Sequence, residues 1–193
     1  MTVRKNLKLT DYQYTGLLLE IATFLALENL GVEPIPLHNP HDNDYAKDQH
    51  LKVDLIFIYE NLLFGVECKN FSSRSHVSYE FIEKEVESRF KNTGLPFAKK
   101  VLVFGVLSFR IIQSLPQEYD LIKLGYQVAA HNDMKGAIED LTRLFKDYLL
   151  SIKTLLDKKK LNLGIYSYMG KDEQLEINKG ILKGLDEKFK EKV

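Results

Sequence analysis

The sequence has one cysteine, no net charge and no long apolar run, and each shortage excludes a class of protein. The lone Cys68 cannot form an internal disulfide, and its position in an apolar stretch favours a small core side chain. The longest apolar run, Val101 to Phe109, is far too short to span a membrane, and the first residues lack the apolar region of a signal peptide. We therefore expect a cytoplasmic protein with no membrane partner.

The charge is balanced, with 27 basic and 27 acidic residues. This balance does not favour a protein held on nucleic acid by bulk electrostatics. The two signs are unevenly distributed, however, because the segment 69–110 is rich in basic residues and the segment 34–61 is acidic. A basic rim around an acidic pocket would still bind DNA phosphates, so the composition leaves DNA open as a partner.

The length sets the number of domains. With 193 residues, of which 45% are hydrophobic, the chain can build one globular domain with a substantial core. No internal repeat or low-complexity tract is visible in the sequence. We expect a core over residues 1–157 and an accessory strand and helix over 158–193, which could also belong to the same domain.

Hydrophobic periodicity and turn signals predict alternating helices and strands. The expected helices cover 11–29, 75 or 78 to 92, 110–123 and 133–157, and the expected strands cover 53–59, 62–69, 100–109 and 126–130, with a further strand over 161–169 and a terminal helix beyond it. This order favours an α/β sandwich with a central mixed β-sheet flanked by helices.

The two strands joined by Glu60-Asn61 carry polar interruptions in otherwise apolar sequence, namely Asp54, Glu67 and Lys69. If Glu60-Asn61 forms a two-residue hairpin turn, in which Asn61 tolerates the positive φ, the register places Asp54 opposite Glu67. Because side chains of a strand alternate between its two faces, all three interruptions share one face.

Two carboxylates on opposed strands repel each other and lie with Cβ atoms about 4.5–5.5 Å apart, so a cation is expected between them. Together with the backbone carbonyl of Cys68 and several waters, Asp54 and Glu67 suit Mg²⁺ or Mn²⁺. Lys69 lies on the same face and can reach a nucleophilic water or the charge that develops beside the metal. The pattern predicts metal-assisted hydrolysis of a phosphodiester; the alternative is a half-exposed hairpin whose charges face solvent.

The arrangement of Asp54 followed by Glu67-Cys68-Lys69 resembles the D…E-x-K signature of the PD-(D/E)XK nuclease superfamily, with Val53 in place of the proline. The resemblance covers about the first two-thirds of the chain. It implies a restriction-endonuclease-like sandwich and a Mg²⁺- or Mn²⁺-dependent DNA endonuclease. In that enzyme Asp54 and Glu67 would bind the metal and Lys69 would position the water.

Glu20 interrupts the apolar stripe of the expected helix 11–29. Because members of the superfamily often supply an extra metal-facing acid from such a helix, the resemblance implies that Glu20 assists as a third acidic group. The alternative is a glutamate at the edge of the stripe that reaches into water. The order of these acidic residues and Lys69 is most similar to archaeal Holliday-junction resolvases, although related restriction and repair nucleases share it.

Cleavage of two DNA strands takes two such sites, so a homodimer is the expected assembly, and the resolvase likeness implies branched DNA as a substrate. Two other functions stay open from the sequence. The chain could keep the nuclease fold with little chemistry and bind nucleic acid or a protein partner. It could also be a structural or regulatory protein whose paired carboxylates only form surface salt bridges.

Overall fold

A computed structural model describes residues 11–37, 52–71, 80, 82–106, 119–128 and 134–162. The chain divides into two compact units, Met1–Leu149 and Leu150–Val193, and the following account concerns the first. The accessory element expected from residue 158 onward lies almost wholly outside the described residues. No helix in the described ranges has both the length and the apolar character needed to cross a membrane.

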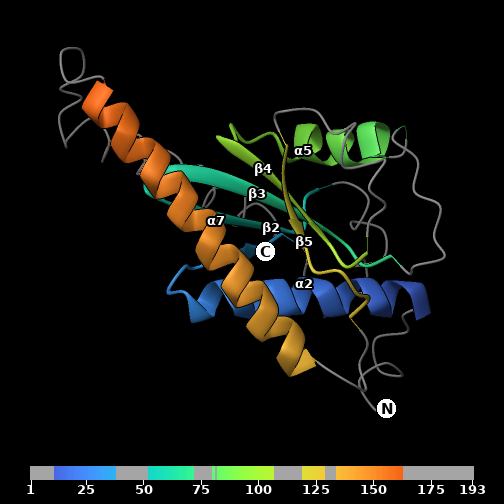
Figure 1. Ribbon diagram of the computed structural model, residues 1–193. Helices are drawn as coiled ribbons and strands as arrows, with labels where there is room; N and C mark the ends of the chain where they lie inside the picture. Colours follow the sequence, from blue (N-terminus) through green and yellow to red (C-terminus); the bar gives the residue numbers. More distant parts are fainter. Residues whose placement is uncertain are drawn as a thin grey trace. The chain divides into compact units, whose positions relative to one another are not determined.

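The first unit is an α/β structure built on one five-stranded mixed sheet (Figure 1). The strands lie in the order β1-β2-β3-β4-β5. Their bounds are Ile35–Pro36 for β1, Leu55–Tyr59 for β2, Leu62–Lys69 for β3, Lys99–Phe104 for β4 and Tyr119–Lys123 for β5. Strand β2 is antiparallel to both β1 and β3, and strands β4 and β5 run parallel to β3. The expected α/β class with a mixed sheet is confirmed.

The hairpin of β2 and β3 is confirmed with its two-residue turn. Glu60 and Asn61 have φ values of 48° and 62°, which is the left-handed conformation that a type I′ turn requires. The ladder follows the predicted register from the turn as far as Leu55 and Val66.

The next predicted pair does not form, and the expectation that Asp54 lies directly opposite Glu67 is wrong. The N–H of Asp54 donates to the carbonyl of Val66 at 3.0 Å, so Asp54 and Leu55 both lie against Val66, as in a β-bulge. A bulge adds one residue to one strand, and a register counted outward from the turn does not include it.

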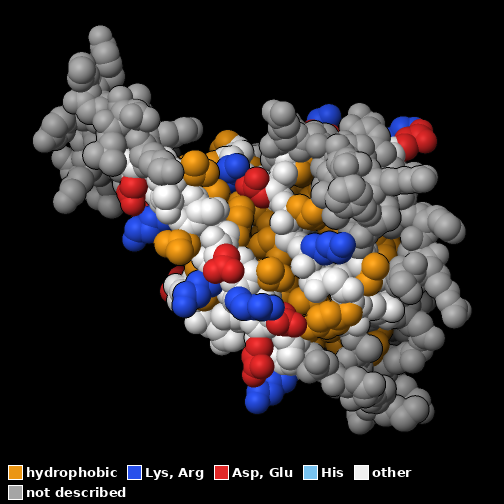
Figure 2. Space-filling view, viewed as in Figure 1, with side chains coloured by type: hydrophobic (Ala, Val, Ile, Leu, Met, Phe, Trp, Pro, Cys, Tyr) orange, Lys and Arg blue, Asp and Glu red, His pale blue; other side chains and the backbone are white. Residues whose placement is uncertain are grey.

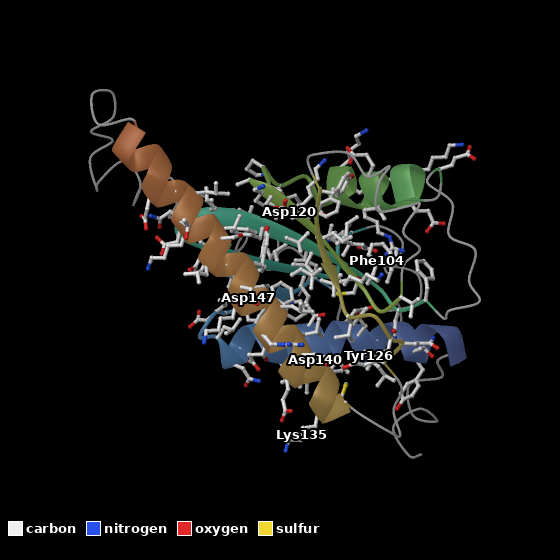
Figure 3. All side chains as sticks on the ribbon, viewed as in Figure 1. Phe104, Asp120, Tyr126, Lys135, Asp140 and Asp147 are labelled. Carbon is white, nitrogen blue, oxygen red and sulfur yellow. The ribbon has the colours of Figure 1, made fainter. Side chains whose placement is uncertain are left out.

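Helix α2 spans Asp11–Asn29, as the sequence predicts. It covers one face of the sheet, where the Sγ of Cys68 lies 3.6 Å from the Oγ1 of Thr23. The first unit's part of helix α7 (Met134–Asn162) lies on that same face, because the ring of Tyr148 packs edge-on against Phe64. Tyr148 also donates to Asp120 at 2.7 Å. Asp120 lies on β5 and is labelled in Figure 3.

Helix α5 (Glu87–Thr93) lies on the other face of the sheet and follows a π-helical segment η1 (Ile82–Val86) (Figure 1). It ends at Gly94, whose φ of 67° provides the left-handed cap that the sequence predicts. The start of the expected helix, at 75 or 78, lies outside the described residues. The ring of Phe90 lies so close to the backbone of Gly65 that a Cβ atom there would be 2.7 Å from a ring carbon.

Three elements differ from the sequence-based expectation. Strand β4 ends at Phe104, residues 105 and 106 form a bend, and residues 107–109 of the expected strand lie outside the described residues. The expected helix 110–123 is wrong over its last residues, which form β5; the rest of it lies outside the described residues. Helix α7 runs on to Asn162, so the expected strand 161–169 begins with helical residues.

The expected strand 126–130 is also wrong for its described residues, which are irregular. The side chain of Asn70 donates to the carbonyl of Val128 at 2.9 Å and accepts from its N–H at 3.0 Å. Because an asparagine side chain satisfies both backbone groups, Val128 is buried without a strand partner. An apolar run indicates burial but does not identify what binds its backbone.

On the face seen in Figure 2, acidic and basic side chains are interspersed among hydrophobic ones, and neither sign forms a continuous patch. This agrees with the balanced composition. Binding to a polyanion on the visible part of this face would therefore gain little from bulk electrostatics.

Gly65→Ala is expected to destabilise the protein by about 1–3 kcal/mol. A Cβ atom at this position would lie 2.7 Å from a ring carbon of Phe90 and 2.8 Å from one of Phe97, so the two rings would have to move away from β3. Chemical denaturation measures the change. Gly16→Ala on α2 is the matched control, because no atom lies within 4 Å of its Cβ and alanine favours the helix by about 1 kcal/mol. Equal losses in the two variants would contradict the close approach of α5.

Candidate metal centre

The three residues singled out in the sequence lie together where β3 extends past the end of β2. The side chains of Asp54, Glu67 and Lys69 are 2%, 0% and 10% exposed. These charged groups therefore do not face solvent. In the alternative of a half-exposed hairpin they would be exposed. Burial of several charges at one end of a strand is costly and marks this place as a candidate site.

The side chain of Asp54 supplies a hydrogen bond to the end of β3 that a neighbouring strand would otherwise provide. Its Oδ2 accepts a hydrogen bond from the N–H of Cys68 at 2.6 Å. The N–H and C=O of one strand residue point to the same side, so the carbonyl of Cys68 also faces the Asp54 side. The carbonyl of Lys69 points the other way and accepts from Gly105 at 3.1 Å. The Cys68 carbonyl thus points to the side on which a metal bound by Asp54 would lie.

The two carboxylate oxygens of Glu67 differ in their hydrogen bonds within the described residues. Its Oε1 accepts from Lys69 Nζ at 2.5 Å and also from Arg89. Within the described part of the chain, its Oε2 is buried and has no hydrogen-bond partner. A buried acceptor without a partner lowers the stability of the folded state by about 1–3 kcal/mol, and a charged acceptor lowers it by more. A hard divalent cation would satisfy this oxygen, and the carboxylate and carbonyl donors here suit Mg²⁺ or Mn²⁺.

Arg89 of α5 is the residue that sequence reasoning missed. Its side chain is 8% exposed, pairs with Glu67 Oε1 and places Nη1 at 3.9 Å from Asp54 Oδ1. It is the cation that two close carboxylates require. The signal was present in the sequence, because Arg89 lies three residues after the buried Val86 and directly before the buried Phe90, within the apolar stripe of the helix.

The site contains two carboxylates and two cations, and their formal charges cancel. Burial raises the pKa of Asp54, although Lys69, Arg89 and the Cys68 N–H lower it in part. Burial and then the neighbouring charge of Asp54 raise the pKa of Glu67 to about 7, against the opposing effect of Lys69 and Arg89. Burial alone would lower the pKa of Lys69, but the negative charges of Glu67 and Asp54 outweigh it and the pKa is raised.

Glu20 lies on α2, on the side of β3 that carries the Cys68 thiol. Burial, then the charges of Asp54 and Glu20, raise the pKa of Cys68 well above its usual value. The thiol is therefore an inert core group, as expected. In the ranges that the structure describes, no three or more His, Cys, Asp or Glu side chains are grouped to hold one metal ion. A role for Glu20 as the third acid stays a prediction.

Asn70 anchors the end of β3 directly after Lys69. Its Nδ2 donates to the carbonyl of Thr15 on α2 at 2.6 Å, and its amide also binds both backbone groups of Val128. Its own carbonyl accepts from Gln127 at 3.2 Å. Asn70 therefore fixes the backbone from which Lys69 projects.

Neither a scan against protein-family models nor searches of the curated proteins and of the solved structures gave a match to this chain. Function is therefore inferred from the geometry and chemistry of the site.

Proposed function

We propose that this protein is a divalent-metal-dependent DNA endonuclease of the PD-(D/E)XK type with a restriction-endonuclease-like core. The observation that supports this most directly is the buried Oε2 of Glu67 beside Asp54, which has no hydrogen-bond partner among the described residues, with Lys69 Nζ at 2.5 Å from the other oxygen. The order α2, β1, β2, β3, α5 and β4 also agrees with the element order of the superfamily.

Asp54, Glu67 and the carbonyl of Cys68 would hold Mg²⁺ or Mn²⁺, with Glu20 as an additional acid from α2. A divalent ion bound there would polarise the phosphodiester and lower the pKa of an attacking water. The hydrogen bond from the Cys68 N–H fixes the Asp54 carboxylate in one orientation at 2.6 Å. A carboxylate held in this way needs no reorganisation when its second oxygen binds.

Lys69 supplies a fixed positive charge. Burial lowers the pKa of Lys69, but the Glu67 carboxylate raises it more strongly together with Asp54, so the net pKa is raised. The ammonium therefore stays protonated at neutral pH. It therefore acts as a donor, which orients the attacking water and stabilises the charge that develops on the phosphate oxygens. It is not a base in this mechanism. Asn70 holds the backbone of Lys69 in register with α2.

The proposed substrate is DNA, and branched DNA is the substrate that the motif order favours. A homodimer would present two sites to two strands. The balanced surface charge favours recognition through the site and its rim over binding along an extended basic face.

The test combines cleavage and metal binding. We expect the wild-type protein to cut at least one of a set of labelled linear, flapped, forked and four-way DNAs in Mg²⁺ or Mn²⁺ and none in EDTA. Asp54→Asn should lower the rate by about 10²-fold or more and abolish the heat of Mn²⁺ binding in calorimetry. Asp140→Asn is the control, because that carboxylate is 41% exposed on α7 and pairs with Arg143. Absence of both cleavage and metal-dependent heat in the wild type would overturn the proposal.

One observation favours a second candidate, a nuclease-fold module with little chemistry that binds nucleic acid or a protein partner. Arg89 and Lys69 already balance the two carboxylates without a metal. Such a module would bind its partner equally well in EDTA, and Asp54→Asn would not alter the binding. The cleavage assay separates it from the nuclease.

A further inference from the structure

We propose that Arg89 is a built-in counter-cation which occupies the carboxylate pair in the absence of metal and competes with the divalent ion for it. This inference rests on the proposed function, because it concerns how the same site accepts its metal. Arg89 is here a positioning residue whose side chain sets the metal affinity.

The contacts of Arg89 place its charge where a metal would act. Its guanidinium pairs with Oε1 of Glu67 and lies 3.9 Å from Oδ1 of Asp54, so a single group spans the two carboxylates. Lys69 binds the same Oε1 at 2.5 Å. Both cations therefore converge on one oxygen of Glu67 and leave Oε2 without a partner among the described residues.

A divalent ion that binds Oε2 of Glu67 and the Asp54 carboxylate would lie within a few ångströms of the guanidinium. At about 4 Å, two like unit charges repel by about 4 kcal/mol at an effective dielectric constant near 20, and the repulsion doubles for a divalent ion. The ion and the guanidinium therefore cannot both hold the pair at full strength. The metal affinity must include the free energy of moving Arg89 away.

The backbone of Arg89 is fixed while its side chain has other rotamers. Thr93 donates its hydroxyl to the carbonyl of Arg89 at 2.7 Å and accepts from the N–H of Val53 at 3.1 Å. One hydroxyl thus links α5 to the residue before Asp54. Metal binding can displace the guanidinium by rotation about the side-chain bonds without moving α5.

The experiment compares wild type, Arg89→Met and Lys91→Met by Mn²⁺ calorimetry and by thermal unfolding in EDTA and in Mn²⁺. We expect Arg89→Met to bind Mn²⁺ about tenfold more tightly or better, because the competing charge is gone. In EDTA its unfolding midpoint should fall by at least about 5 °C, since two buried carboxylates then share one cation, and Mn²⁺ should restore it. Lys91→Met removes the same charge from the same helix at a side chain that is 73% exposed. Its Mn²⁺ affinity should stay within about twofold of wild type.

The outcomes separate this inference from the proposed function. Equal Mn²⁺ affinities in wild type and Arg89→Met overturn the competition and leave the metal site standing. Absence of Mn²⁺ binding in both overturns the proposed function itself. If Arg89→Met does not fold in either condition, Arg89→Lys provides the test, because a single ammonium replaces the planar guanidinium that spans the two carboxylates. A Mn²⁺ affinity at least about threefold tighter than wild type supports the competition, and an unchanged affinity overturns it.

Discussion

Lys69→Ala is expected to lower the rate of DNA cleavage by about 10²–10⁴-fold and to leave DNA affinity within about threefold. The ammonium is 10% exposed and lies at the carboxylate that would hold the metal, so under the proposed function its charge would act mainly on the reacting phosphate. An interaction made mainly in the transition state changes the rate far more than the binding. The measurement is single-turnover cleavage beside an equilibrium DNA-binding titration in Ca²⁺ or EDTA.

Lys84→Ala provides the control for the loss of one lysine, because its side chain is 73% exposed and pairs with Glu80 on the same helix turn. It should retain the wild-type rate within about twofold. Circular dichroism must show Lys69→Ala folded, since Glu67 loses one of its two cationic partners. Wild-type cleavage by folded Lys69→Ala would refute the assigned role of the amine.

The protein without metal should lose stability as the pH rises from about 4.5 to about 7, and Glu67 is the group responsible. Burial and the charge of Asp54 raise its pKa from 4.5 to about 7 in the folded state. The folded state therefore binds this proton more tightly than the unfolded state, and the stabilisation that protonation provides is lost through this window as the pH increases. A shift of this size corresponds to about 3 kcal/mol. The raised pKa of Asp54, for which burial is the largest cause, acts in the same direction.

Urea unfolding at pH 5 and pH 8 in EDTA tests this sign, with Glu67→Gln as the comparison. The amide cannot ionise, so that variant should lose most of the decrease between the two pH values. Mn²⁺ should return stability to the wild type at pH 8, because a metal binds the ionised carboxylate. A wild type that is equally stable at both pH values, or a Glu67→Gln variant with the same decrease, would exclude this pKa shift.

The parts of the fold that were predicted correctly depend on local chemistry. The turn at Glu60-Asn61 fixes a hairpin through two residues with positive φ, and α2 follows from the apolar stripe over 11–29. The irregular stretch 126–128 was not predictable, because Asn70, far away in the sequence, supplies the hydrogen bonds to Val128. Local patterns do not contain such a partner.

The same division holds for the site. Asp54, Glu67 and Lys69 could be grouped from strand alternation alone, and the structure brings all three together. Arg89 could not be grouped with them, because it reaches Glu67 across 22 positions of sequence through the packing of α5 on β3. The bulge at Asp54 was equally hidden, since it depends on where β2 ends.

Asn70 reads only main-chain atoms of its neighbours, at Thr15 and Val128. These hydrogen bonds place no demand on the side chain at Thr15 or Val128, although burial keeps Val128 apolar. Asn70 itself must offer a donor and an acceptor in one planar group on a short side chain, and glutamine carries the same group one methylene further out. Related chains, when aligned, should show an invariant asparagine directly after the lysine and an apolar residue at the position of Val128. In a related chain with glutamine or aspartate at this position, we expect different hydrogen bonds between α2, the end of β3 and the stretch after β5.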